Sequence, residues 1–223
     1  MTDDEGGIRP VSISPAVIER IVTPGVCAVV RDDRLRLVWC NDEYARAHGS
    51  SRDQLRGSLL TDIHPKAQAE ERARLFEPAL RGDRVVDYVQ LWKGKRYLTR
   101  VWPLDPASFG TPGIFITMSP WFSGDTDARF NDIPIASAGE LADLQTLSRR
   151  ELQVLHPLAH GLSAREIAER QGRSVSTVER QIESIHAKLR LSNRAEVVRF
   201  VVERGLHGFT EEQWSRLISI SDS

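Results

Sequence analysis

The residues best suited to chemistry lie at the start and on one face of a helix that the sequence predicts after the capping residue Ser174. Hydrogen-bond donors recur there at helical spacing: Arg173, Ser176, Thr177, Arg180, Gln181, Ser184 and Lys188. Apolar residues occupy the opposite face at three- and four-residue steps: Val175, Val178, Ile182, Ile185 and Leu189. Donors of this kind bind phosphate oxygens and base edges. The pattern therefore predicts a helix that binds nucleic acid.

The charge around this helix supports the same prediction. Residues 147–206 contain eleven Lys or Arg and seven Asp or Glu, a net of about +4, whereas the whole chain has a formal charge of −1. The positive charge is thus local, as a phosphate-binding module requires. Charge alone leaves open a solvated helical domain that binds nothing.

Four short helices must position these side chains, and capping residues mark where each begins. A Ser or Asn stands three residues before a Glu at Ser148, Ser163 and Asn193, and Ser174 caps the remaining helix. Only Gln171, Gly172 and Arg173 separate the second helix from the third. A turn this short that contains glycine is typical of a helix-turn-helix.

The same segment resembles a known family. The stretches LSRRE, LAHGLSAREIAE, SVSTVE and NRAEVV match, in order and spacing, the LuxR-type (GerE-like) helix-turn-helix domain of bacterial transcription regulators. The resemblance implies an all-α four-helix domain with a scaffold helix at 163–171, a recognition helix at 174–191 in the major groove, and a final helix at 194–204. It further implies DNA-backbone contacts from Ser174, Thr177, Lys188 and Arg194.

The positions that read bases depart from the family pattern. Glu179 stands where Lys is usual, Gln181 replaces a His, and Glu183 occupies a position that is frequently basic. With Arg180, these residues become the expected readers: Arg pairs with guanine, Gln with adenine, and Glu accepts from cytosine N4. Acidic side chains near phosphates also weaken binding. Glu179 and Glu183 therefore either specify an unusual operator or weaken DNA binding.

The final helix is expected to pair two subunits. Val197, Val198 and Val201 form an apolar strip that is too narrow for a full core and suits dimerisation. The resemblance implies a homodimer on DNA, with half-sites about one helical turn apart.

The first 120 residues alternate strand and helix signals. Strands are expected at 26–31, 35–40, 85–91, 96–103 and 113–119, with Lys93-Gly94-Lys95 as a hairpin turn. A helix is expected at 66–81, where Pro78 should kink it or end it early. Two strands, then helices, then three strands is an α+β order.

This order is similar to that of a PAS sensor domain. The residues that carry the resemblance are PGVCAVVRDD and LVWCNDEYARAHGSSRDQLRGSLLTDIHP, in which Asn41 caps a helix. The resemblance implies a five-stranded antiparallel sheet with short helices that holds a small molecule, a cofactor or nothing. The predicted organisation is a PAS-like domain at 14–120, a linker at 121–139, the helix-turn-helix domain at 140–207 and an amphipathic C-terminal helix at 208–223. That last helix could cover the dimer face or the PAS domain.

The cofactor of the PAS-like domain is unknown from sequence, and none is required. Cys27 and Cys40 do not lie in the helical motif of flavin photosensors and are better explained as buried small side chains. His64 is the candidate haem ligand, but it precedes a proline, where helix is disfavoured. We find no metal-ligand spacing and no catalytic arrangement, so an enzyme is not expected. The sequence thus argues against haem and flavin and leaves a small-molecule ligand open.

The function predicted from these patterns is a bacterial sequence-specific transcription regulator. Its PAS domain would sense a small molecule or mediate dimerisation. The expected partners are double-stranded DNA, a second copy of the chain, a PAS ligand and RNA polymerase, and no membrane. A cytoplasmic location is expected, because neither a signal peptide nor an apolar membrane span is recognisable. The alternative is a protein-binding adaptor or anti-regulator that uses the acidic recognition helix without specific DNA binding.

Overall fold

The computed structural model describes residues 8–122 and 133–220. Residues 1–7, 123–132 and 221–223 lie outside this description, and with them most of the predicted linker and the end of the predicted C-terminal helix. The chain divides into two compact units. The first comprises Met1–Tyr88 and Leu98–Ser119, and the second Val89–Tyr97 and Pro120–Ser223.

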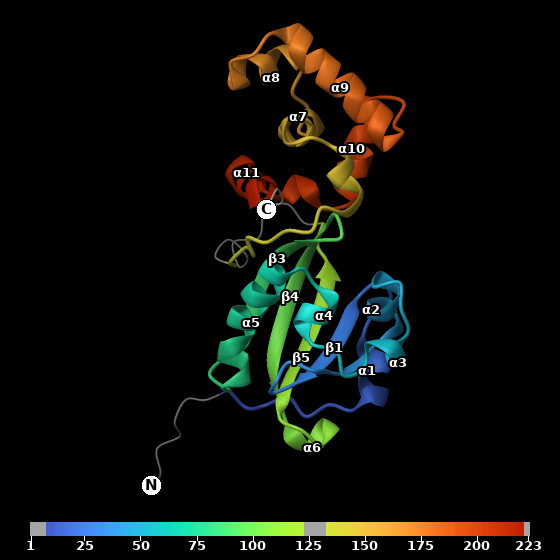
Figure 1. Ribbon diagram of the computed structural model, residues 1–223, viewed down its shortest axis with the longest axis vertical. Helices are drawn as coiled ribbons and strands as arrows, with labels where there is room; N and C mark the ends of the chain where they lie inside the picture. Colours follow the sequence, from blue (N-terminus) through green and yellow to red (C-terminus); the bar gives the residue numbers. More distant parts are fainter. Residues whose placement is uncertain (1–7, 123–132, 221–223) are drawn as a thin grey trace. The chain divides into compact units, whose positions relative to one another are not determined.

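The first unit is built on a sheet of five strands (Figure 1). These are β1 (Cys27–Asp32), β2 (Leu37–Cys40), β3 (Val86–Trp92), β4 (Lys95–Leu104) and β5 (Gly113–Pro120), in the spatial order β2-β1-β5-β4-β3. Strand β1 pairs antiparallel with both β2 and β5. The predicted five-stranded antiparallel sheet with short helices is thus confirmed.

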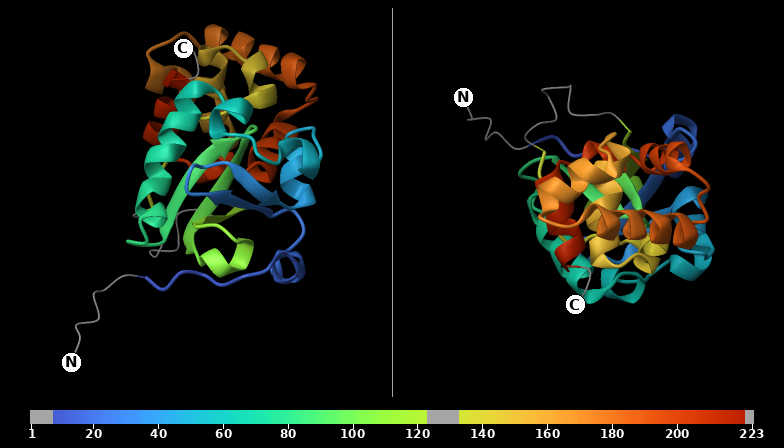
Figure 2. Two further views of the ribbon diagram at one scale, coloured as in Figure 1. Left: turned by 60° about the horizontal axis from the view of Figure 1, so that its bottom comes forward. Right: turned by 90° about the horizontal axis from the view of Figure 1, so that it is seen from above.

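Helices and the N-terminal segment cover both faces of this sheet. On β1, Ala28 and Val30 pack with Ile18 of α1 (Pro15–Ile21), while the alternate residues Val29 and Arg31 face the other way. On that second face lie α2 (Asp42–Ala47), α4 (Leu60–Ile63) and α5 (Lys66–Leu80) (Figures 1 and 2). Two further short helices are α3 (Arg52–Leu55) and α6 (Pro106–Phe109). Strand β1 therefore contributes side chains to two cores.

Two local predictions in this unit have different outcomes. Asn41 caps α2 as expected: its Oδ1 accepts from the Tyr44 backbone N–H at 3.1 Å and from the Ala28 N–H at 3.0 Å. The prediction that Pro78 ends its helix early is wrong, because α5 continues to Leu80, and the alternative of a kink stays a prediction. Pro78 lies in the last turn, so its missing N–H removes only one bond of the helix.

The buried cysteines lie where the sequence placed them, on strands, and are unsuited to nucleophilic chemistry. Burial raises the pKa of Cys27 to about 12 and that of Cys40 to about 11. Since the thiolate is the reactive form, both side chains serve as small apolar groups.

The second unit is mainly helical, with α7 at its centre (Figure 1). Its helices are α7 (Arg149–Ala159), α8 (Ala164–Gln171), α9 (Val175–Leu189), α10 (Arg194–Glu203) and α11 (Glu211–Ile220), with the 3₁₀ turns η2 (Ala142–Thr146) and η3 (Leu206–Gly208). Each of α8, α9, α10 and α11 contacts α7. The side chains of Ser148, Ser163, Ser174 and Asn193 accept backbone hydrogen bonds as helix caps, as the sequence predicted.

Helix α11 packs on α7. Trp214, Leu217 and Ile218 are buried, and the Trp214 indole donates a hydrogen bond of 2.8 Å to the Leu152 carbonyl. The core of the helical unit is therefore larger than four helices would provide.

The tip of the β3–β4 hairpin groups with the second unit, and the predicted domain boundaries stay a prediction. Lys93 and Gly94 both have positive φ, as a tight hairpin turn requires. Strand β3 lies at the edge of the sheet, and the segment after residue 132 pairs with its outer side. The Val89 N–H donates to the Pro134 carbonyl at 2.9 Å, and the Glu140 N–H donates to the Leu91 carbonyl at 2.9 Å. Backbone pairing at this edge explains why the hairpin tip groups with the C-terminal residues.

Candidate nucleic-acid interface

Helices α8 and α9 are joined by a tight turn that fixes where α9 begins. Gly172 adopts a left-handed conformation with φ of 62°, and the Arg173 N–H donates to the Ala168 carbonyl at 2.9 Å. The Ser174 hydroxyl then caps α9 by accepting from the Thr177 N–H at 3.2 Å. The first turn of α9 is thus held in place before any partner binds.

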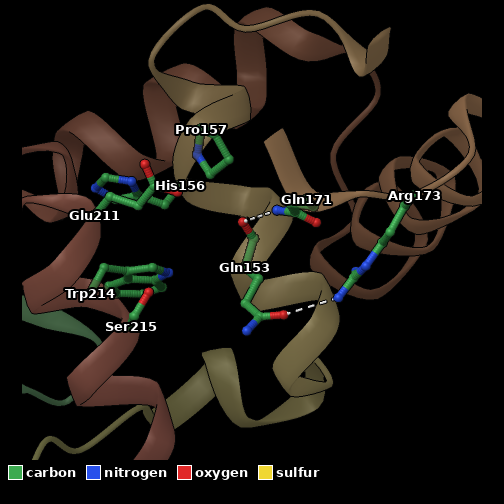
Figure 3. Close-up of a pocket in the computed structure, with 8 residues that line it drawn as sticks. All are labelled: Gln153, His156, Pro157, Gln171, Arg173, Glu211, Trp214 and Ser215. Carbon is green, nitrogen blue, oxygen red and sulfur yellow. Dashed lines mark hydrogen bonds between the residues drawn. The ribbon is translucent and has the colours of Figure 1, made fainter. Parts of the chain in front are cut away.

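Side chains also anchor this turn to α7 (Figure 3). The Gln171 amide donates to the Gln153 carbonyl at 3.1 Å, and the Arg173 guanidinium donates to the Gln153 side-chain oxygen at 3.3 Å. The side chains of Gln153, Gln171 and Arg173 line a groove of about 240 Å³, and Trp214 lies on its opposite side. Arg173, predicted as one of the donors for nucleic acid, is therefore engaged inside the helical unit.

The exposed face of α9 carries most of the predicted base readers. Thr177, Glu179, Arg180 and Glu183 are exposed, and Gln181 is half-buried. Within the described part of the chain, Glu179, Arg180 and Glu183 form no ion pair or hydrogen bond between side chains. Their charges are therefore available to a partner.

Lys188, in contrast, is held by a carboxylate of the same unit. Its ammonium lies 2.7 Å from Glu151 Oε2 and 3.0 Å from Oε1, and the Ser184 hydroxyl donates to the same carboxylate at 2.5 Å. Glu151 is also the third residue of α7 and accepts from the Ser148 N–H at 2.6 Å. The charge of Lys188 therefore ties α9 to α7, and the DNA-backbone contact expected of it stays a prediction.

These contacts keep Glu151 ionised. Burial alone would raise its pKa, but the hydrogen bonds from Lys188, Ser184 and Ser148 outweigh burial and lower it to about 2. Because the folded-state pKa lies below the ordinary value of 4.5, this stabilisation is complete above about pH 4.5. It is lost as the pH falls through about 2. The tie between α7 and α9 therefore persists at any physiological pH.

Arg194 donates hydrogen bonds to carbonyl groups at the C-terminal end of α7. Its guanidinium donates to the Leu162 carbonyl at 2.9 Å and to the Leu158 carbonyl at 3.4 Å. These oxygens lie at and just beyond the C-terminus of α7, where a cation also favours the helix dipole. The side chain is exposed, so phosphate contact remains a prediction, but it already has a structural role.

The residues predicted for dimerisation on α10 differ in their exposure. Val197 is 0% and Val201 1% exposed, because both pack inside the subunit, while Val198 is half-buried. Val202, which is not among the predicted residues, is 44% exposed. Of the four valines of α10, Val198 and Val202 are therefore the ones that are accessible from outside, and they lie one turn apart.

Neither metal binding nor membrane spanning finds support in the described residues. They contain no group of three or more His, Cys, Asp or Glu side chains placed to hold a metal ion. None of their helices combines the length and apolarity needed to cross a bilayer.

Comparison with known proteins agrees with the two architectures. Residues 145–201 match the family of bacterial regulatory proteins called the luxR family, and residues 22–120 match the PAS fold. No curated protein matches the chain.

Among solved structures, similarity extends over most of the chain at low identity. The Vibrio cholerae VqmA dimer without target DNA is 17% identical, with coverage of 92% of this chain and 94% of that chain and a TM-score of 0.43. The Vibrio cholerae VqmA–ligand–DNA complex is 16% identical, with coverage of 89% and 92% and a TM-score of 0.47. The phage VqmA–DPO complex is 19% identical, with coverage of 88% and 91% and a TM-score of 0.44. With TM-scores below 0.5, these similarities do not define a function.

The helical unit thus contains a LuxR-type helix-turn-helix domain at residues 145–201, and residues 22–120, which form most of the sheet, are a PAS domain.

Proposed function

We propose that this protein is a bacterial sequence-specific transcription regulator whose PAS domain senses a small molecule or mediates dimerisation and modulates DNA binding by the helix-turn-helix. The exposed face of α9, with Glu179, Arg180 and Glu183 uncommitted, carries the proposal. Because the target is DNA, the protein acts in the bacterial cytoplasm, and RNA polymerase is the partner on which regulation acts.

The proposed contacts follow the position of each side chain on α9. Ser174 and Thr177 lie at the N-terminus of the helix, where hydroxyl and backbone donors bind phosphate. Arg180 lies one turn further and reads guanine, and Glu179 and Glu183 accept from cytosine N4. Half-buried Gln181 is left to pair with adenine if it turns outward.

Arg180→Ala tests the base-reading role. We expect a loss of about 1–3 kcal/mol in binding to the selected operator and a relaxed preference at one base pair. The operator is first selected from random duplexes with the intact protein, and affinities are then measured by fluorescence anisotropy at fixed salt. Arg216→Ala is the matched control, since Arg216 is an exposed arginine of α11 that pairs with Glu212. Equal affinity and equal preference in both variants would exclude Arg180 as a reader.

The acidic face of α9 favours a second candidate function. Glu179 and Glu183 are one turn apart and uncompensated among the described residues, so they could bind a basic surface of a partner protein. In that case the protein is an adaptor or anti-regulator that lacks specific DNA binding.

Glu179→Lys separates these functions. If Glu179 reads cytosine, the variant changes the preferred operator while the overall affinity stays comparable. If the carboxylate only repels phosphate, the variant binds every duplex more tightly, with a steeper salt dependence. If the protein is an adaptor, the intact chain shows only non-specific affinity, and the variant loses a co-purifying partner. Glu212→Lys makes the same charge change on α11 and is the control. A uniform gain across unrelated duplexes would contradict the reading role.

We also propose that two copies bind DNA together through α10. Val198 and Val202 form a small apolar surface on α10. A surface of this size can pair two subunits on DNA, and each subunit can still stay folded without the other. Val202→Asp is expected to abolish cooperative binding to paired half-sites while the far-UV circular dichroism spectrum is unchanged. The mass of the complex by analytical ultracentrifugation checks this. A single subunit on a paired site would refute the dimer.

A further inference from the structure

Positive charge is buried inside the PAS domain. Arg31 of β1 is 1% exposed and Arg72 of α5 is 6% exposed, and both line one cavity beneath the helix-covered face of the sheet. Arginine is almost never fully buried unless a partner compensates its charge. Since the hydrogen-bond partners of Arg31 are all uncharged, the burial of its charge requires an explanation.

The cavity has a lining that suits an anion. Its polar walls are Arg31, Arg72, His64, Tyr44 and Tyr88. Its apolar walls include Val29, Leu60, Phe76, Ile116 and Met118. The described lining contains no Asp or Glu. Its volume of about 20 Å³ has room for a group slightly larger than a water molecule.

Neutral oxygen atoms hold Arg31 at present. Its guanidinium donates to the Leu35 carbonyl at 2.6 Å, to the Ser58 carbonyl at 3.3 Å and to the Tyr44 hydroxyl at 3.4 Å. Carbonyl and hydroxyl oxygens satisfy hydrogen bonds but carry no full negative charge to offset that of the guanidinium. An anion in the cavity would offset it.

Arg72 and the tyrosines complete a set of donors around the same space. Arg72 donates to Gln68 at 2.9 Å and is hydrogen-bonded to Tyr88. Burial raises the pKa of both Tyr44 and Tyr88, although the nearby arginines act in the opposite direction. Both hydroxyls therefore stay protonated and able to donate to a bound oxygen.

We propose that this cavity binds the carboxylate of a small organic acid, held by Arg31 and Arg72, with the hydroxyls of Tyr44 and Tyr88 as further donors. Guanidinium groups match a planar carboxylate by paired hydrogen bonds. The volume of about 20 Å³ admits little more than the carboxylate group itself, so formate fits best, and acetate and longer acids need the walls to move. The inference rests on the sensory role proposed above for the PAS domain and gives the chemical class of its ligand.

The test uses the full-length protein with sodium formate, acetate and propionate as probes. Acetamide is the neutral comparison for acetate, and sodium chloride at the same ionic strength is the comparison for charge alone. We expect saturable heat in isothermal titration calorimetry and a rise in the unfolding temperature with at least one acid. Neither effect is expected with acetamide or chloride. Equal stabilisation by chloride, or no saturable binding of any of the three acids, overturns the proposal.

Substitutions assign the binding to the cavity. Arg72→Met and Arg31→Lys are each expected to weaken acid binding at least about tenfold, since each removes or displaces a charge-assisted hydrogen bond. Arg74→Met changes an exposed arginine of the same helix and should leave the affinity unchanged. Circular dichroism checks that each variant is folded, and Arg72→Lys replaces Arg72→Met if the latter is not. Unchanged affinity in the cavity variants overturns the site.

DNA binding is measured separately on the same preparations. Acid binding without specific DNA binding would contradict the proposed function and leave the carboxylate site standing. Specific DNA binding without acid binding would do the reverse.

Discussion

Replacing Glu151 with alanine is expected to lower the free energy of unfolding of the helical domain by about 3 kcal/mol. The carboxylate accepts from Ser148, Ser184 and Lys188, so its removal undoes a helix cap and leaves two donors of α9 without their acceptor. Urea denaturation followed by circular dichroism at 222 nm measures the change. The same variant should weaken DNA binding, because α9 loses its tie to α7.

The matched control is Glu166→Ala. Glu166 occupies the equivalent position in the capping box of α8, where it accepts from Ser163, but it is exposed and reaches no other helix. Its removal should therefore cost clearly less than that of Glu151. A double-mutant cycle between Glu151→Ala and Lys188→Ala isolates the pair. Equal losses in the two Glu variants would show that the contacts with α9 add nothing to capping.

Acid is expected to destabilise the helical domain well before Glu151 titrates. His156 is buried on α7, where its imidazole Nε2–H donates to the Phe209 carbonyl at 2.8 Å and its ring stacks on Trp214. Burial lowers its pKa from 6.5 to about 4, although the bond to Phe209 acts in the opposite direction. Between those two values the unfolded chain binds a proton that the folded chain excludes. Stability should therefore fall from about pH 6.5 to pH 4, by up to about 3 kcal/mol.

Urea denaturation of wild type and His156→Gln at pH 7 and pH 5 checks this expectation. The variant should be less stable at pH 7 but lose less stability on acidification. His160→Gln, a change of the exposed neighbour, is the control. Its charge is only a minor cause of the lowered pKa of His156, so this variant should retain most of the wild-type pH dependence. An identical loss of stability in His156→Gln and wild type would contradict the assignment to His156.

Local rules were sufficient for the order and limits of most elements. Capping by Ser148, Ser163 and Ser174 depends on residues three apart in the chain, so it was readable without any knowledge of tertiary structure. At the start of the predicted helix-turn-helix domain, by contrast, the chain forms a 3₁₀ turn at Ala142–Thr146. Ala142 has φ of 49°, which an α-helix cannot accommodate, and the sequence contains no glycine there to signal it.

Site residues were less predictable because their roles depend on distant partners. Lys188 lies on the polar face of α9, as the periodicity indicated, yet Glu151 is thirty-seven residues away and engages it. Val197 and Val201 are on the apolar strip of α10, but periodicity cannot separate a strip that faces the subunit core from one that faces a partner. Within the PAS domain, the alternation of β1 places Arg31 on the face of the sheet opposite to that of Val30, and burial of this face depends on helices that follow later in the chain.

The pairing of residues 134–140 with β3 has a consequence for dissecting the protein. Fragments cut at the limits of the two family matches would separate partners that hydrogen-bond through their backbones, at Val89–Pro134 and Leu91–Glu140. A fragment ending near residue 120 would expose the edge of β3, and open strand edges invite self-association. A fragment starting near residue 140 would lose Arg96, whose guanidinium lies over the rings of Trp121 and Phe209. The limits of the two family matches are therefore unsuitable as fragment boundaries, and aggregation of a sensor fragment cut there would be an artefact of truncation.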